Sequence, residues 1–186
     1  MGIIEESRKY ALSEIEKYGA PTLIAFEISE KKAIELARKL KADETIVRVG
    51  IVLMDVKLGQ ALKEGRLKEH VAMSSQASKV FLEKYNLDEK TKNKIINCIE
   101  AHHKKIKFSC IESEICGNAD CYRFMTPKGF LSFLNSLGKR DGDFKTCLKI
   151  AEEKLDEKSK ILSLDICKKE LIESYKILKR LIRESQ

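Results

Sequence analysis

Residues 46–55 read Ile-Val-Arg-Val-Gly-Ile-Val-Leu-Met-Asp. Arg48 and Asp55 are the only charged residues in a segment that is otherwise apolar on every side. Asp43 and Thr45, just before it, have side-chain oxygens that favour a helix start. A helix that is apolar all round is buried, so this segment predicts the central helix of a domain. A central strand is the alternative, because a short apolar run does not separate the two by periodicity.

Outward from this segment the chain has only two prolines and nine glycines, and apolar residues recur three and four residues apart. This spacing predicts an all-α fold. Residues 138–142 form the clearest break. We therefore expect a helical core over 1–138 and a C-terminal helical extension over 139–186 that packs on the core. The expected helices, besides one that closes at 15–18, are 22–40, 46–55, 66–85, 89–103, 113–124, 127–137, 143–157 and 164–184.

Composition narrows the class of protein. The 186 residues are 43% hydrophobic and 35% charged, which favours a globular domain over a disordered chain. No apolar run approaches the roughly 18 residues of a membrane span, and the first residues are acidic where a signal peptide is basic. We expect a cytoplasmic protein without a membrane partner, in which the six cysteines are reduced and mostly buried.

The net charge is +7, and residues 57–107 carry twelve basic and six acidic side chains, a surplus of six. A local positive field suits an anionic ligand such as a phosphate, although solvated lysine-rich helix faces give the same count. The chain has no Trp and 6% aromatic residues. Nucleic acid is therefore an unlikely partner, because stacking residues are scarce.

All three histidines of the chain, together with two aspartates, fall at positions that a helical reading turns inward. They are His70, His102, His103, Asp55 and Asp120. Burying a lone carboxylate costs several kcal/mol unless a charge or a metal compensates. Imidazole nitrogens and carboxylate oxygens suit iron, manganese and zinc. Each residue alone also fits an ordinary core or capping role.

The order of these residues resembles the HD superfamily of metal-dependent phosphohydrolases. The resemblance rests on 52–55 (Val-Leu-Met-Asp), on 69–74 (Glu-His-Val-Ala-Met-Ser), on 99–103 (Ile-Glu-Ala-His-His) and on Ala119-Asp120, and it covers about residues 22–135. It implies an all-α bundle around a metal site. Asp55 resembles the bridging aspartate of the His-Asp pair, His70, His102 and His103 resemble ligands of the second metal, and Asp120 resembles the closing aspartate.

Two positions depart from the family pattern, and both belong to the first metal site. Met54 stands where the family has the histidine of the His-Asp pair, and Ala25-Phe26-Glu27 stand where its first histidine is expected. Glu27 is a speculative substitute ligand. We therefore expect one divalent ion, iron, manganese or zinc, rather than two.

The resemblance implies hydrolysis of a phosphate ester or nucleotide-type substrate by a metal-activated water. Asp55 and Asp120 are then the candidate catalytic bases. Lys104, Lys105 and Arg123 are candidate phosphate-binding residues because they lie beside the ligands in sequence. Lys104 and Lys105 are equally well interpreted as part of a solvated lysine cluster.

Three other interpretations stay open. A degenerate HD domain that binds metal or ligand without turnover would explain the two lost histidines. An iron oxygenase of the HD fold fits less well, because such enzymes have both metal sites complete. A structural zinc site from Cys110, Cys116 and Cys121 with a nearby histidine is weaker still, because the cysteine spacing is not that of a zinc knuckle. The C-terminal helices cover the core or form a homodimer contact.

Overall fold

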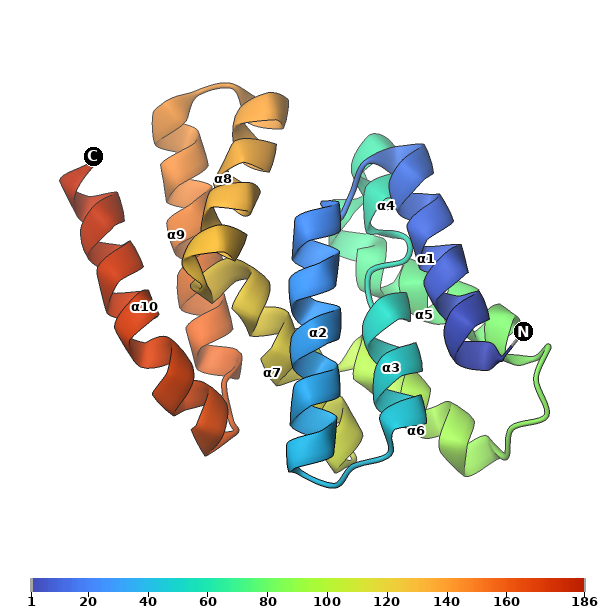
Figure 1. The fold of residues 1–186 in the computed structure, drawn as a ribbon. Helices are drawn as coiled ribbons and strands as arrows, with labels where there is room; N and C mark the ends of the chain where they lie inside the picture. Colours follow the sequence, from blue (N-terminus) through green and yellow to red (C-terminus); the bar gives the residue numbers. More distant parts are fainter. Residues whose placement is uncertain (1, 186) are drawn as a thin grey trace.

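A computed structural model describes residues 2–185, apart from the side chain of Asp141. These residues form ten α-helices and one short 3₁₀ helix, with no strand among them (Figure 1), which confirms the all-α prediction. No helix in this part of the chain has the length and apolar character to cross a bilayer. The elements are α1 (Ile3–Tyr18), α2 (Leu23–Lys39), α3 (Glu44–Leu53), α4 (Leu58–Lys63), η1 (Leu67–Glu69), α5 (His70–Leu82), α6 (Glu89–Glu100), α7 (Ile111–Met125), α8 (Pro127–Asp141), α9 (Phe144–Ile161) and α10 (Asp165–Glu184).

Helix α3 is the predicted central helix, and the strand alternative is wrong. The Asp43 side chain caps it by accepting hydrogen bonds from the backbone N–H groups of Thr45 and Ile46. Its apolar residues are buried, and it contacts α1, α2, α6 and α7. Because α3 is covered on all sides, Asp55, which follows its last turn, is held inside the molecule.

Helix α7 is the second buried helix. Every residue from Glu112 to Met125 is buried except Glu114, and the helix contacts α2, α3, α6, α8, α9 and α10. It begins two residues before the predicted start. Polar residues on so buried a helix must find partners inside the protein, and two of them, Asp120 and Arg123, do so near Asp55.

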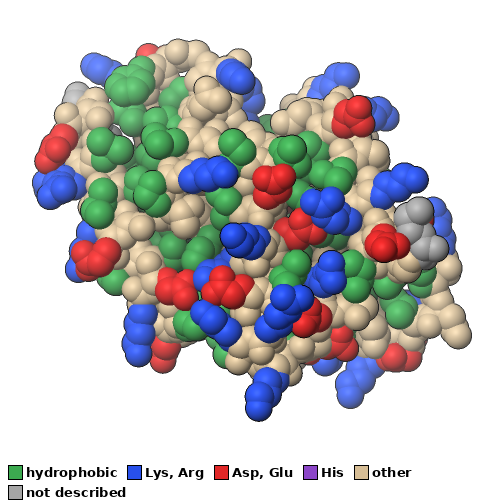
Figure 2. All heavy atoms as spheres, viewed as in Figure 1, with side chains coloured by type: hydrophobic (Ala, Val, Ile, Leu, Met, Phe, Trp, Pro, Cys, Tyr) green, Lys and Arg blue, Asp and Glu red, His purple; other side chains and the backbone are tan. Residues whose placement is uncertain are grey.

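The C-terminal helices α8, α9 and α10 lie together at one side of the molecule (Figure 1). Gly138 lies within α8, and the chain reverses at Gly142, whose φ is +74°. The turn therefore comes at the end of the predicted break, and helix α9 then packs against α7 and α8. On the face drawn in Figure 2, hydrophobic side chains gather at the upper left, and charged side chains lie around that area and over the rest of the face.

Candidate metal site

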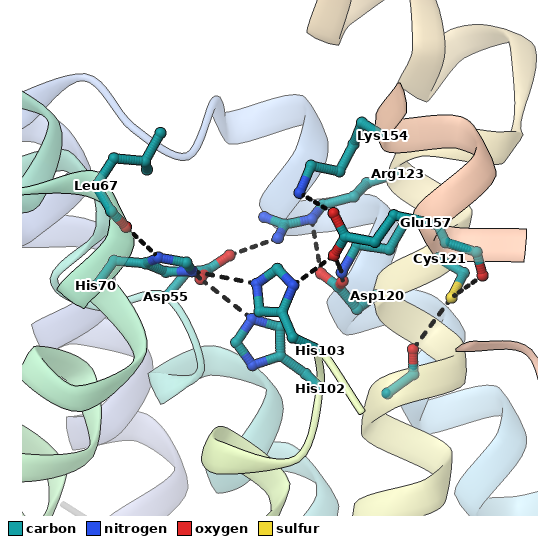
Figure 3. Close-up of polar contacts among 12 residues, drawn as sticks. Asp55, Leu67, His70, His102, His103, Asp120, Cys121, Arg123, Lys154 and Glu157 are labelled. Carbon is teal, nitrogen blue, oxygen red and sulfur yellow. Dashed lines mark hydrogen bonds and ion pairs between the residues drawn. The ribbon is translucent and has the colours of Figure 1, made fainter. Parts of the chain in front are cut away.

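Four segments of the chain bring the predicted site residues together (Figure 3). Asp55 follows α3, and His70 is the first residue of α5. His102 and His103 follow the end of α6, and Asp120 lies in the middle of α7. Asp55 and Asp120, the first and last of these residues, are 65 positions apart in sequence. The packing of α3, α5, α6 and α7 therefore brings the side chains together.

The three histidine rings share one hydrogen-bonding arrangement. In each ring Nδ1 lies against an oxygen that only accepts hydrogen bonds, so Nδ1 carries the hydrogen and a neutral ring leaves a lone pair on Nε2. The distances are 2.7 Å from His70 Nδ1 to the Leu67 carbonyl, 2.6 Å from His102 Nδ1 to the Ile99 carbonyl, and 2.6 Å from His103 Nδ1 to Glu157 Oε1.

The lone pairs converge. One ligand atom from each of His70, His102 and His103 lies within 4.8 Å of the others, and the Nε2 atoms of His70 and His103 are 3.3 Å apart. Asp55 Oδ1 lies 3.5 Å from His70 Nε2 and 3.7 Å from His102 Nε2. Converging lone pairs repel one another unless a proton or a cation lies between them.

Two atoms of this cluster are buried without a hydrogen-bond partner, Asp55 Oδ1 and His102 Nε2. Buried polar atoms in folded proteins nearly always have a partner, and binding of an ion is one recognised reason for an exception. Nitrogen and carboxylate oxygen are suitable ligands for a divalent transition metal. The three histidines therefore fit a metal ion, and Asp55 Oδ1 lies beside two of them as a further candidate ligand.

The protonation states suit ligands. Complete burial lowers the pKa of His102 to about 3, against the attraction of the Asp55 carboxylate. Burial also lowers the pKa of His103, although the hydrogen bond to Glu157 opposes the shift. Both rings are therefore neutral at pH 7, as metal ligands must be.

The other face of Asp55 meets a fixed cation. Arg123 Nη2 donates to Asp55 Oδ2 at 2.5 Å, and Arg123 Nε lies 2.7 Å from Asp120 Oδ1. Lys158 Nζ, with its side chain fully buried, lies 2.6 Å from Asp120 Oδ2. Both oxygens of Asp120 therefore face cations of the protein, and Asp55 joins this ionic cluster to the histidines.

These contacts keep the two aspartates ionised. Burial raises the pKa of each carboxyl, but the nearby cations outweigh it. Arg123 lowers the pKa of Asp55 well below its usual range. Arg123 and Lys158 lower the pKa of Asp120 to about 2.

The remaining predicted residues lie at different depths. Lys104 and Lys105 are exposed on the loop after α6, and Lys104 Nζ donates to the carbonyl of Lys160 on α9. Arg123 is only 7% exposed. Glu27 is exposed on α2 and is not among the residues that line the cavity beside Asp55 and Asp120, so the structure gives no support to it as a substitute ligand.

The two positions that depart from the family pattern meet beside the ionic cluster. Phe26 and Met54 line a small cavity of about 20 Å³ together with Asp55, Asp120 and Arg123. This is room for about one water molecule. Apolar side chains and the Arg123 guanidinium thus surround the side of Asp55 that faces away from the histidines.

Two residues of the site, Glu157 and Lys158, are absent from the sequence-based expectation. They come from α9, in a helix rich in Lys and Glu that resembles a solvated surface helix. One signal was available for Lys158, because it continues the buried three-and-four spacing of Ala151, Leu155 and Ile161. A cation on the apolar face of a helix indicates a buried anionic partner.

The cysteines do not form a comparable group. All six are free, and only Cys110 is incompletely buried. Among the residues that the structure describes, the three histidines are the one group of at least three His, Cys, Asp or Glu side chains at metal-ligand separation. The proposed zinc site of Cys110, Cys116 and Cys121 is therefore not supported.

The arrangement of the helices is similar to that of a solved protein. A crystal structure of a predicted HD superfamily hydrolase from an uncultured Thermotogales bacterium superposes with a TM-score of 0.60, covering 82% of this chain and 84% of that one, at 15% sequence identity. The chain has the HD-domain fold. This confirms the fold that the order of Asp55, His70, His102-His103 and Asp120 implies. No protein-family model and no curated protein matches the sequence.

Proposed function

We propose that the protein is a metal-dependent hydrolase built on the HD fold, with one divalent ion of iron, manganese or zinc held by His70, His102, His103 and Asp55. The observation that carries this proposal is the grouping of one ligand atom from each of the three histidines within 4.8 Å, with Asp55 Oδ1 close to His70 Nε2 and His102 Nε2. Two of these buried atoms, Asp55 Oδ1 and His102 Nε2, have no hydrogen-bond partner. A bound ion lowers the pKa of a water molecule toward neutrality and polarises a phosphoryl oxygen.

Charge supports an anionic substrate, which we propose to be a phosphate ester or nucleotide. The carboxylates of Asp55 and Asp120 are balanced by the cations of Arg123 and Lys158. The charge of a divalent ion beside them is therefore not cancelled, and it favours a negatively charged ligand. His70 and His103 retain 14% and 17% side-chain exposure, which leaves the cluster open to solvent on that side.

The residues take different roles in this proposal. Lys104 and Lys105 are exposed beside the histidines, and their ammonium groups suit substrate phosphates. Arg123 is held by two carboxylates, so we assign it to orienting Asp55. The low pKa values of Asp55 and Asp120 make them weak proton acceptors near pH 7. They therefore fit ligand and ion-pair roles better than that of a general base.

A second candidate is a domain that binds metal or ligand without turnover. It is favoured by Arg123 and Lys158, because protein side chains already supply two positive charges beside Asp55 and Asp120. Such a site needs no further ion next to Asp120. The iron-oxygenase alternative has no comparable support.

An activity screen separates these candidates. Protein loaded with Mn²⁺, Fe²⁺ or Zn²⁺ is assayed against phosphomonoesters and phosphodiesters, with oxygen consumption recorded for the iron form. We expect hydrolysis of a phosphate ester that falls at least 100-fold in His102→Ala, whose folding is checked by circular dichroism. Retention of metal without turnover of any ester would support the binding domain, and oxygen consumption would support the oxygenase.

A further inference from the structure

The three histidines differ in what fixes their rings. His70 and His102 each donate from Nδ1 to a carbonyl three residues earlier in the chain, at Leu67 and Ile99. Their orientation is therefore set within their own segments. His103 instead donates to a carboxylate 54 residues away, on α9. Its orientation depends on a helix that carries none of the proposed ligands.

Glu157 is itself held in place. Its second oxygen, Oε2, accepts from Lys154 Nζ at 2.5 Å, one turn earlier on the same helix. The next residue, Lys158, is buried against Asp120, which fixes the register of α9 beside the site. The bond from Lys104 Nζ to the Lys160 carbonyl ties the loop after His103 to the same helix.

We infer that Glu157 is a positioning residue of the metal site, which accepts the Nδ1 hydrogen of His103 and so presents His103 Nε2 to the ion. This inference rests on the proposed function, since it assigns His103 as a ligand. Carboxylate partners of this kind orient histidine ligands and increase their basicity, and their loss lowers metal affinity about 10- to 100-fold. Helix α9 is then part of the site.

Metal affinity tests the inference. Zn²⁺ binding is measured by competition with a chromophoric chelator for the whole protein and three variants. We expect Glu157→Ala to bind Zn²⁺ about 10- to 100-fold more weakly. Glu157→Gln should recover most of this loss, because its amide oxygen still accepts from Nδ1. Glu153→Ala, at an exposed position of the same helix, should bind like the wild type.

Nitrogen NMR of the histidine rings supplies a readout that a merely structural role would not move. In the metal-free wild type, His103 should carry its hydrogen on Nδ1, and Glu157→Ala should populate the Nε2-protonated form, with His70 and His102 unchanged. Equal Zn²⁺ affinity in Glu157→Ala and wild type would overturn the inference while the proposed function stands. A wild type that binds no Zn²⁺ would overturn the proposed function. An Nε2-protonated His103 in the metal-free wild type would overturn the hydrogen bond to Glu157, and with it the inference.

Discussion

Arg123 Nη2 lies 2.5 Å from Asp55 Oδ2, so the carboxylate that faces the histidines with one oxygen is held by a fixed cation through the other. This contact divides the centre of the molecule into two parts. On one side lies an ionic cluster that the protein completes by itself. On the other side lie the three histidine rings, whose Nε2 atoms are the donor atoms of the proposed metal site.

The ionic cluster predicts a large effect for Asp120→Asn. Arg123 and Lys158 would keep their burial and lose a charged partner, and breaking a buried pair typically costs about 3–5 kcal/mol. We expect a fall of that size in the free energy of unfolding, measured with urea. Asp165→Asn is the matched control, because Asp165 is 84% exposed and pairs with the exposed Lys168, so its change should stay below about 1 kcal/mol. Equal effects of the two substitutions would contradict the buried cluster.

The low pKa of Asp120 predicts that its contribution to the free energy of unfolding depends on pH. The pKa of Asp120 is lowered from 3.8 to about 2 in the folded protein, so its contribution is complete above its unfolded pKa and is lost as the pH falls through the folded value. The stability difference between wild type and Asp120→Asn should therefore narrow by about 2 kcal/mol between pH 5 and pH 2. Urea titrations at several pH values measure it. A difference that stays constant over this range would show that the carboxylate has an ordinary pKa.

The absence of a side chain at Gly50 lets α3 pack closely against α6. A Cβ at Gly50 would lie 2.6 Å from the Cβ of Cys98, which is too close without movement of a helix. We expect Gly50→Ala to reduce the free energy of unfolding by about 1–3 kcal/mol. It should also weaken metal binding, because α3 precedes Asp55 and α6 precedes His102.

Gly138→Ala is the control for this substitution. Gly138 lies in α8, and nothing lies within 4 Å of the position of its Cβ. The extra methyl group should therefore stabilise the protein by about 0.5–1 kcal/mol through helix propensity. If Gly50→Ala were equally well tolerated, the close contact of α3 and α6 would be wrong.

We expect Arg123→Ala to change the number of metal ions that the protein binds. Without the guanidinium, Asp55 and Asp120 become two buried carboxylates with one remaining ammonium partner, Lys158, and a divalent ion can compensate their charge. We expect the wild type to bind one Mn²⁺, and Arg123→Ala to bind a second, weaker one, by equilibrium dialysis. Arg180→Ala, exposed on α10, should bind one. A single Mn²⁺ in all three proteins would mean that Arg123 does not take the place of an ion.

Much of the fold could be predicted from local pattern. The all-round apolar character of 46–55 indicates a buried helix, and the inward positions of the histidines and aspartates indicate a polar centre. The prediction that the histidines and aspartates lie together in one site came from their order along the chain, which resembles the HD pattern. The ion pairs were harder to predict, because Arg123 is equally suited to a phosphate and to a carboxylate.

The contribution of α9 could not be predicted from that pattern. Glu157 is one of many acidic residues in a charged helix, and its contact with His103 spans 54 positions. Such a contact depends on how α9 packs against α7, which the spacing of apolar residues leaves open. Lys158 alone had a local signal, as a cation on an apolar helix face.

The proposed metal site is tested by the metal content of protein purified without chelator or metal-affinity resin, measured by elemental analysis beside His70→Ala and His102→Ala. We expect about one equivalent of iron, manganese or zinc in the wild type and its loss in both variants. A wild type without metal, with both variants folded and as stable as the wild type, would contradict it.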